Sequence, residues 1–224
     1  RKKEVGKYIK PVHFVNIGGV ANRTTISEGL LKDFTFSATD IGPGMCLIDK
    51  WIKKNSKKKY DKNGNIAEDG KINKKILNKA LENFWDKLSY IKNTSIQKIM
   101  SYDVSDFNSS LVQGLSLEDG AATLTEYTAK IIYTDIFFAH NKIAKVILCG
   151  GGRKNKFLFK RIKKLFTNNI SIQLIDDYGI DGDFVESQAF GYLAIRSHLK
   201  LPISFPSTTG CKKASTGGVI VKNY

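Results

Sequence analysis

The sequence predicts a mixed α/β protein in which helices flank a single sheet. Short β-branched runs open the chain, and strand-like runs alternate with helical segments in its second half. An alternation of strands and helices is typical of α/β folds, whereas a bundle lacks strands and a sandwich lacks helices. The order of elements therefore favours a mixed sheet with flanking helices.

The first strands are expected at residues 13–17 and 23–26, where β-branched residues are separated by a short turn of Gly and Asn. A third strand is expected at 34–40. The Gly-Pro-Gly run at 42–44 breaks this extended pattern, and helical spacing begins over 46–54.

The middle of the chain is expected to hold two helices and two irregular stretches. Residues 53–70 are polar and predict a surface connection, whereas the apolar positions of 76–84 share one helical face. No period holds over 90–114, which predicts loop with short elements. Ser116 and Asp119 then form an acidic variant of the capping box, which begins the clearest helix of the chain.

The second half alternates regularly. The expected elements are a strand at 145–149, a helix at 157–166, a strand at 171–175, a helix at 183–199 and a short strand at 218–221.

Length and composition indicate a globular protein of one large domain or two small ones. The chain has 224 residues, of which 42% are hydrophobic and 25% charged. No apolar run approaches the ~20 residues that span a bilayer, so no membrane anchor is expected. The basic residues 1–10 do not precede a secretory apolar region, which favours a cytoplasmic location. Cys46, Cys149 and Cys211 lack paired spacing and are interpreted as reduced and structural.

The net charge of +15 raises the alternative of a basic protein that binds nucleic acid. Lysines are spread through every segment, however, and the densest runs, at 53–59, 71–75 and 160–164, are expected on solvated helix faces. No nucleic-acid reading module accompanies them, so we expect no nucleic-acid partner. Attraction of a phosphorylated ligand is a simpler use of the same charge.

The turn that runs from Asn16 to Asn22 carries paired glycines between two amide side chains. Gly18 and Gly19 allow close approach of the backbone to a polar ligand, and the amides supply donors and acceptors. An ordinary hairpin turn explains the same residues.

Asp40 lies at the end of the third expected strand, beside Gly42 and Gly44. A carboxylate in that position can face a cleft lined by backbone N–H groups, which is a suitable place for a general base. A turn or helix-cap aspartate is the alternative.

Gly150, Gly151 and Gly152 follow a buried-type strand, and Asn155 opens the next helix. This arrangement lets the backbone pass close to a nucleotide, with the helix dipole favouring phosphate. It matches neither a Walker loop nor the Rossmann spacing, so a packing turn between strand and helix remains the alternative.

Taken together and in order, these segments resemble the anhydro-N-acetylmuramic acid kinases. The resemblance runs from His13 onward through NIGGVAN, TDIGPG with Asp49 and Trp51, YDKNG, SLEDGAATLTEYTA, CGGGRKN, GIDGDFVESQAF and PSTTG. It implies the acetate and sugar kinase, Hsc70 and actin superfamily, in which two α/β lobes clamp ATP between them. The chain would then be the C-terminal lobe and part of the interlobe region of an actin-like ATPase fold.

The resemblance also implies roles in peptidoglycan recycling. Asp40 would activate water to open the 1,6-anhydro ring, and ATP with Mg²⁺ would phosphorylate the freed O6. The implied site residues are Asn16, Gly18, Gly19, Asn22, Gly42, Gly44 and Ser101 for the sugar, and Gly150, Gly151, Gly152 and Asn155 for the nucleotide. No metal ligand is assigned in this chain.

Four residues depart from the pattern of the family. Met100 and Val104 stand where two cationic side chains are usual, while Ile41 and Met45 replace a threonine and an asparagine. The departures predict weaker polar contacts to the sugar.

The resemblance also predicts that residues 1–224 are the C-terminal part of a kinase whose first lobe, with a phosphate loop and a magnesium-positioning acid, is absent. The chain alone is then expected to be inactive, because phosphoryl transfer depends on positioning and charge neutralisation. A partner lobe supplied separately and a homodimer are both compatible with the resemblance. The competing hypothesis is a decayed, non-catalytic remnant that at most binds sugar or nucleotide.

Overall fold

A computed structural model describes residues 11–28, 34–94, 99–139, 145–166 and 170–221. Its centre is a five-stranded sheet in the order β3-β2-β1-β4-β5. The strands are β1 (Val12–Ile17), β2 (Val20–Glu28), β3 (Phe34–Pro43), β4 (Lys145–Cys149) and β5 (Ser171–Leu174).

The sheet is mixed, as the sequence predicts. β1, β2 and β3 form an antiparallel meander, whereas β4 joins β1 in parallel and β5 joins β4 in parallel. The parallel pairs require helical crossovers, since a short hairpin cannot join parallel strands.

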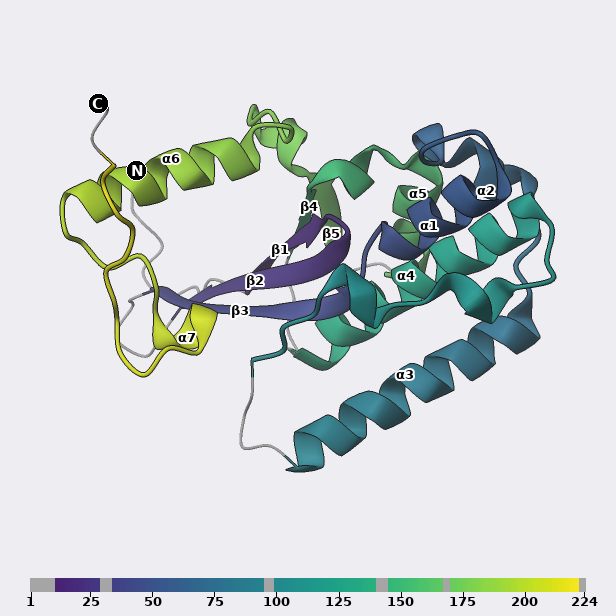
Figure 1. The fold of residues 1–224 in the computed structure, drawn as a ribbon, viewed down its shortest axis with the longest axis horizontal. Coiled ribbons are helices and arrows are strands. Elements are labelled where there is room, and N and C mark those ends of the chain that lie inside the picture. The colour runs from purple at the N-terminus through teal and green to yellow at the C-terminus, as the bar shows by residue number, and fades with distance from the viewer. Residues whose placement is uncertain (1–10, 29–33, 95–98, 140–144, 167–169, 222–224) are drawn as a thin grey trace, which may run out of the picture.

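Most helices cover one face of the sheet, as Figure 1 shows. The helices are α1 (Cys46–Asn55), α2 (Asn65–Asp69), α3 (Lys74–Thr94), α4 (Leu117–Ala139), α5 (Lys156–Leu165), α6 (Val185–His198) and α7 (Pro206–Thr209). Alternate β1 and β2 residues, including Val15, Ile17 and Ala21, are fully buried toward α1, α4 and α5. The mixed sheet with flanking helices is therefore confirmed.

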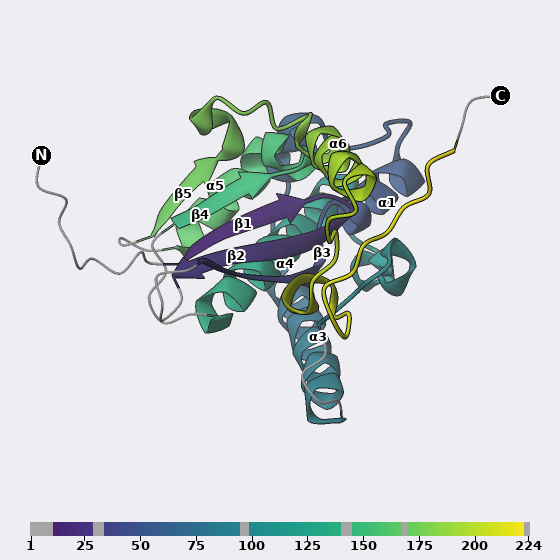
Figure 2. The same ribbon diagram turned by 90° about the vertical axis from the view of Figure 1, so that its left-hand side faces the viewer.

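The opposite face of the sheet has a much smaller cluster, in which Ile147, Cys149 and Ile175 are buried. Val185, at the start of α6, packs against this cluster. Figure 2 shows α6 on the side of the sheet away from α3 and α4. This side is called the open face below.

α4 forms the centre of the core. It lies between the sheet and α3, and apolar side chains such as Leu124, Ile131 and Ile132 are fully buried on it. The serine half of the expected capping box is present, because the Asp119 N–H donates to Ser116 Oγ at 3.1 Å. The Asp119 carboxylate accepts the Lys71 N–H, at 2.7 Å. A helix that is apolar on most of its surface is stable only when other elements surround it.

The prediction of a polar surface connection at 53–70 is wrong in part. Asp61 is buried and its two carboxylate oxygens accept the N–H groups of Ile66 and Ala67, at 2.9 and 3.0 Å. This capping holds α2, which buries Ile66 and Ala67 against the core. The polar composition hid the element because a short helix needs few apolar residues.

The prediction of a final strand at 218–221 is also wrong. These residues have no regular structure, and the preceding segment forms α7 and an isolated bridge between Ser204 and Ser215. A β-branched run becomes a strand only where a neighbouring strand accepts its hydrogen bonds. In addition, β3 runs on to Pro43 and α3 runs on to Thr94, beyond the ends that the sequence indicates.

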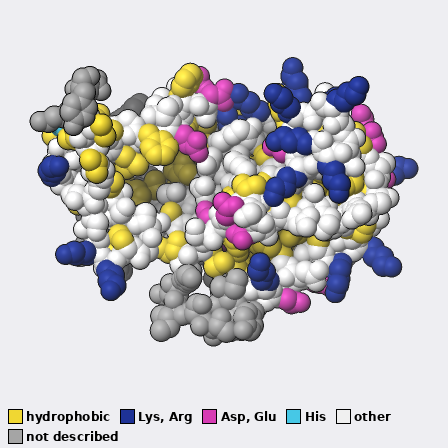
Figure 3. Space-filling model, viewed as in Figure 1, with side chains coloured by type: hydrophobic (Ala, Val, Ile, Leu, Met, Phe, Trp, Pro, Cys, Tyr) yellow, Lys and Arg dark blue, Asp and Glu magenta, His cyan; other side chains and the backbone are white. Residues whose placement is uncertain are grey.

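The lysines of the three dense runs are exposed, but only residues 160–164 lie wholly on a helix, α5. The expected helix faces are wrong for residues 56–59 and 71–73, which lie in the connections after α1 and before α3. Lys and Arg side chains are scattered over the α1, α2 and α5 side of the molecule in Figure 3. In the part of the chain that the structure describes, no helix is both long enough and apolar enough to cross a membrane.

Replacement of two helical glycines by alanine is expected to have opposite effects on stability. A Cβ at Gly120 would overlap the Trp51 ring, whose Nε1 donates to Leu117 O at 2.9 Å. Gly120→Ala should therefore lower the free energy of unfolding by about 1–3 kcal/mol, the usual cost of overpacking, despite the better helix propensity of alanine. The urea midpoint measures this change.

Gly191, inside α6, is the matched control, because a Cβ at this position would have no other atom within 4 Å. Gly191→Ala should leave the midpoint unchanged or raise it, because alanine is favoured in helices by about 1 kcal/mol. Equal effects of the two substitutions would contradict the packing of Trp51 on α4.

Candidate functional site

Two Gly-rich turns meet at one edge of the sheet. β1 and β4 are parallel neighbours, so the turn at Gly18 and Gly19 and the turn at Gly150 begin at adjacent strand ends. Ligands of open α/β sheets bind outside the carboxyl ends of the parallel strands. The structure therefore brings together the sugar and nucleotide segments that the sequence predicts.

The three consecutive glycines have different roles. A side chain at Gly150 (φ +77°) would overlap Asn16 Oδ1, and one at Gly152 would overlap Ile17, so both glycines allow the two turns to touch. Gly151 has open space around it. Only this middle position can face a ligand without a packing requirement of its own.

Arg153 holds the second turn in place. It is buried, and its guanidinium donates to both carboxylate oxygens of Asp176 at 2.7 and 3.0 Å, to Asp183 at 3.0 Å and to Gly150 O at 3.1 Å. The hydrogen bonds from Arg153 are the main reason that the pKa of Asp176 falls to about 2. A bidentate pair of this kind fixes the turn relative to the segment before α6.

A cavity of about 420 Å³ lies on the helix side of the turns. It is called the helix-side cavity and is lined by Ile17, Gly18, Gly19, Met45, Asp49, Tyr60, Asp61, Asn63, Gly151, Gly152, Lys154 and Asn155. Its volume is within the range of small-molecule sites.

Two buried polar atoms of the helix-side cavity lack partners among the described residues. Asn155 is 3% exposed; its Oδ1 accepts the Leu158 N–H and caps α5, whereas its Nδ2 has no acceptor. Asp49 Oδ1 has no donor. Burial raises the pKa of Asp49, partly offset by Lys53 and reinforced by Asp61. Because unpaired buried polar groups are costly, a donor and an acceptor here favour a polar ligand or water.

A second cavity, of about 920 Å³, lies on the open face and is called the open-face cavity. Asn16 and Asn22 line it from β1 and β2, and Glu186, Ala189 and Tyr192 line it from α6. Gly18 and Gly151 line both cavities, so the two spaces adjoin at the Gly-rich turns.

Asp40 continues a polar row across the open face. The strand register pairs Asn16 with Asn22 and Asn22 with Asp40, so the three side chains stand on neighbouring strands. Asp40 Oδ2 accepts the Tyr102 N–H at 2.7 Å, and the Asp40 N–H donates to Met100 O at 3.0 Å. Ser101, which is exposed, lies between these two contacts and is thereby held beside Asp40.

Gly42 and Gly44 are buried behind the first turn. A side chain at Gly42 would press on Phe84 and Ile131, while one at Gly44 would overlap Gly18 O. Gly44 N–H donates to Gly19 O at 2.9 Å. Their visible role is packing, and no ligand role is needed to explain them.

The four residues that depart from the family pattern have distinct surroundings. Ile41 is buried in the core and Met45 lines the helix-side cavity. Met100 borders Asp40 through its main chain. Val104 O accepts from Lys50 Nζ at 2.6 Å, and Phe107 O accepts from the same ammonium at 3.0 Å. The ammonium of Lys50, from α1, therefore lies at the turn where Val104 stands in place of the usual cationic side chain.

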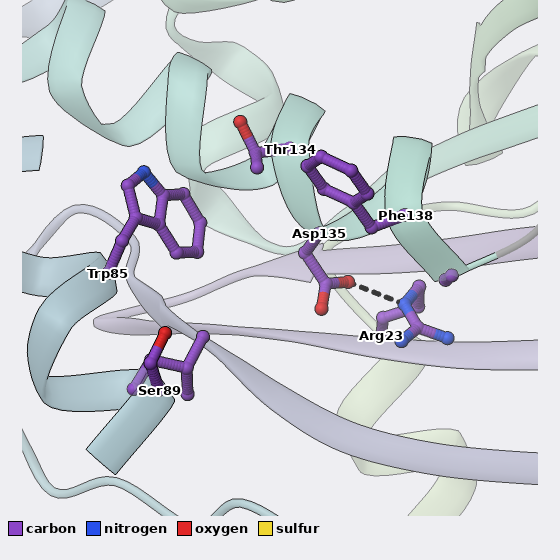
Figure 4. Close-up of a pocket in the computed structure, with 8 residues that line it drawn as sticks. Arg23, Trp85, Ser89, Thr134, Asp135 and Phe138 are labelled. Carbon is purple, nitrogen blue, oxygen red and sulfur yellow. Dashed lines mark hydrogen bonds and ion pairs between the residues drawn. The ribbon is translucent and has the colours of Figure 1, made fainter. Parts of the chain in front are cut away.

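A third hollow, of about 430 Å³, lies between α3 and α4 (Figure 4). Trp85 and Ser89 line it from α3, and Phe138 lines it from α4. On its floor Arg23 Nε donates to Asp135 Oδ2 at 2.6 Å. The arginine is buried and paired. None of the residues that line this hollow has a predicted functional role.

The described residues contain no group of three His, Cys, Asp or Glu side chains that could hold a metal ion. Asp49 and Asp61 both line the helix-side cavity, but Asp61 uses both oxygens to cap α2. Cys46 and Cys149 are buried free thiols whose pKa values burial raises, to about 11 for Cys149. This part of the chain does not supply a complete magnesium site.

No site role was predicted from the sequence for several residues that line the cavities. These are Asp49 and Lys154 in the helix-side cavity and Glu186 and Tyr192 in the open-face cavity. Asp49, Lys154 and Glu186 lie within the motifs that carry the family resemblance, but polar residues near the ends of helices are common, so their types alone did not indicate a ligand contact.

The sequence profile described as anhydro-N-acetylmuramic acid kinase matches residues 7–223. The kinase of that name from Pelagibacter ubique (strain HTCC1062) is 48% identical over 222 residues, which are 97% of this chain and 57% of the relative. Those from Zymomonas mobilis and Agrobacterium fabrum are each 35% identical, over 94% and 95% of this chain and 54% of each relative.

The chain therefore belongs to the anhydro-N-acetylmuramic acid kinase family, a family of sugar kinases in the phosphotransferase class. It spans about half the length of the curated relatives it matches. Among solved structures, an activator of 2-hydroxyisocaproyl-CoA dehydratase from Clostridium difficile with bound ADPNP is 15% identical, with a TM-score of 0.42 over 71% of this chain and 53% of that one.

Proposed function

We propose that this chain is the part of an anhydro-N-acetylmuramic acid kinase that activates the attacking water and holds the nucleotide. The observation that carries the proposal is the polar row of Asp40, Asn22 and Asn16, which ends at the Gly-rich turns shared by two adjoining cavities. One space can hold the sugar and the other the nucleotide, with the phosphates between them.

On the sugar side, Asp40 acts as the general base. Its carboxylate takes a proton from water, whose oxygen attacks the anomeric carbon of the 1,6-anhydro sugar and breaks the bond from that carbon to O6. The released O6 then accepts the γ-phosphate of ATP, which gives N-acetylmuramic acid 6-phosphate and ADP. The Tyr102 N–H orients the carboxylate, and Asn16, Asn22 and Ser101 stand close enough in the fold to contact sugar hydroxyls.

On the nucleotide side, the helix-side cavity holds the nucleoside and the phosphates cross Gly151 and Gly18. The unpaired Asn155 Nδ2 and Asp49 Oδ1 support this assignment, since ribose hydroxyls both donate and accept hydrogen bonds. Gly151 allows the backbone to approach the phosphates because nothing else occupies its side-chain space.

Magnesium would enter with ATP and neutralise its phosphate charge. The described residues lack a complete set of ligands for it, so the positioning carboxylate is expected in a phosphate-loop lobe, which the longer relatives have room to encode. The actin-like, two-lobed arrangement, the cytoplasmic location and a homodimer belong to the same proposal. The chain without such a lobe is expected to be inactive.

The nucleotide assignment predicts that Gly151→Asp weakens binding. The chain should bind Mg-ADP weakly, and Gly151→Asp should raise the Kd by about tenfold or more, because a carboxylate at this position repels phosphate. Isothermal titration calorimetry measures the change. Gly151→Asn has the same shape without the charge and is the control. A Kd unaffected by Gly151→Asp would show that the phosphates do not bind at this turn.

Asn155 offers a second test, in which folding and binding are separated. Asn155→Ser keeps a side-chain oxygen for the α5 cap, so the free energy of unfolding should change by less than about 0.5 kcal/mol. Loss of the Nδ2 donor should raise the Kd for Mg-ADP about threefold to tenfold, the value of one hydrogen bond. If Asn155→Ser binds ADP as tightly as the parent chain, Nδ2 does not contact the nucleotide.

The catalytic assignment predicts that Asp40→Asn abolishes activity. The parent for this test is this chain fused to the region of the Pelagibacter ubique kinase outside the match. Asparagine keeps the acceptor for the Tyr102 N–H but cannot take a proton, so turnover should fall by about 10²–10⁴-fold. A coupled ADP-release assay with the anhydro sugar measures turnover.

Asp103→Asn is the matched control, because Asp103 is an exposed carboxylate nearby that caps a short helix, and asparagine caps equally well. It should retain activity. Wild-type turnover in Asp40→Asn would reduce Asp40 to a turn residue. An inactive parent fusion, beside an active Pelagibacter enzyme, would favour the non-catalytic alternative and direct attention to Ile41, Met45, Met100 and Val104.

A further inference from the structure

Residues 100–107, which lie between α3 and α4 in the chain, are called the bracing segment because they hold Asp40. The Tyr102 N–H donates to Asp40 Oδ2 at 2.7 Å, and the Asp40 N–H donates to Met100 O at 3.0 Å. The Met100 N–H in turn donates to Thr39 Oγ1 at 3.2 Å. The orientation of the Asp40 carboxylate therefore depends on where the bracing segment lies.

The bracing segment is tied together internally. Asp103 caps the short helix Val104–Asp106, since its Oδ1 accepts the Ser105 N–H at 2.8 Å, and Asp106 Oδ2 accepts the Asp103 N–H at 2.7 Å. The rings of Tyr102 and Phe107 lie against each other, with their centroids 5.3 Å apart. A displacement at the Phe107 end is therefore transmitted to Tyr102, which holds Asp40.

Lys50 attaches the other end of the bracing segment to α1. Its ammonium donates to Val104 O at 2.6 Å and to Phe107 O at 3.0 Å. Carbonyl groups at the end of a helix lack partners within the helix, and a lysine ammonium can satisfy them. Val104 also rests on the first Gly turn, because a Cβ at Gly19 would lie 3.1 Å from Val104 Cγ2.

We propose that Lys50 is a positioning residue for Asp40. Its ammonium holds the bracing segment against α1, and the segment fixes the Tyr102 N–H that orients the Asp40 carboxylate. Hydrogen bonds from a charged donor are stronger than those between neutral groups, so one side chain can hold two carbonyl groups at once.

This inference deepens the proposed function and rests on it for the effect on turnover. The placement of Tyr102 against Asp40 is tested separately, in the chain alone and without substrate.

The first test measures hydrogen exchange of single amides by NMR. Lys50→Met keeps the length of the side chain and removes its donors, so the Tyr102 and Asp40 amides should exchange about tenfold faster, the value of a charge-assisted hydrogen bond. The Leu124 amide, in the buried part of α4, should not change, which separates a local opening from loss of the fold. Lys50→Arg retains charged donors and should restore most of the protection.

Lys54→Met is the matched control, because Lys54 is an exposed lysine one turn further along α1. It should leave the exchange of Tyr102 unchanged.

The second test uses the fusion described for Asp40→Asn. Lys50→Met should lower kcat about tenfold and leave the KM for the anhydro sugar unchanged, because a misplaced base weakens the transition state and not the binding of substrate. Lys50→Arg should recover most of the kcat. In the Asp40→Asn fusion, Lys50→Met should cause no further loss, since both changes act through one carboxylate.

Unchanged exchange of the Tyr102 amide in Lys50→Met overturns the inference, and so does an equal effect of Lys54→Met. Where Asp40→Asn abolishes turnover, a Lys50→Met fusion with the parental kcat overturns it as well. A higher KM with unchanged Tyr102 exchange would make Lys50 a substrate-binding residue instead. The proposed function fails on a different observation, wild-type turnover in Asp40→Asn, and the exchange measurement still decides whether Lys50 places the segment.

Discussion

The main-chain junction between the first Gly turn and the start of α1 is the contact on which the site depends. Gly18 O and Gly19 O accept the N–H groups of Gly44, Met45 and Cys46 at 2.8–3.1 Å. A side chain at Gly44 would overlap Gly18 O, so only glycine permits the approach. The junction fixes the β1–β2 turn against α1, and α1 in turn carries Asp49 to the helix-side cavity and Lys50 to the Val104 turn.

A second constraint acts at the neighbouring strand end. Gly150 and Gly152 touch Asn16 and Ile17 too closely for side chains, and Arg153 ties this turn to Asp176 and Asp183. The two turns are therefore braced from opposite directions, and Gly151 is left free between them. Gly150 and Gly152 are needed for packing between the turns, and Gly151 is open to a ligand. These separate roles explain the run of three glycines.

The two faces of the sheet are covered unequally. The face of the sheet toward α4 holds most of the core, whereas the open face carries the polar row, the open-face cavity and α6. Apolar surface left exposed costs free energy in water, and the apolar side chains Phe190 and Ile195 of α6 are largely exposed beside this cavity.

The sequence by itself determined the five strands of the sheet and the five longer helices, the Ser116 and Asn155 caps, and the Gly-rich turns, because periodicity, caps and turns depend on neighbouring residues. It also identified the family through motifs in order. Only the tertiary structure decided that Asp61 caps a buried helix, that residues 218–221 form no strand, and that Lys50 reaches the Val104 turn. It alone placed Asp49 and Gly151 in the lining of one cavity, and it separated Gly42 and Gly44, which pack, from Gly151, which is open. These features depend on which distant segments meet, and local patterning carries no information about that.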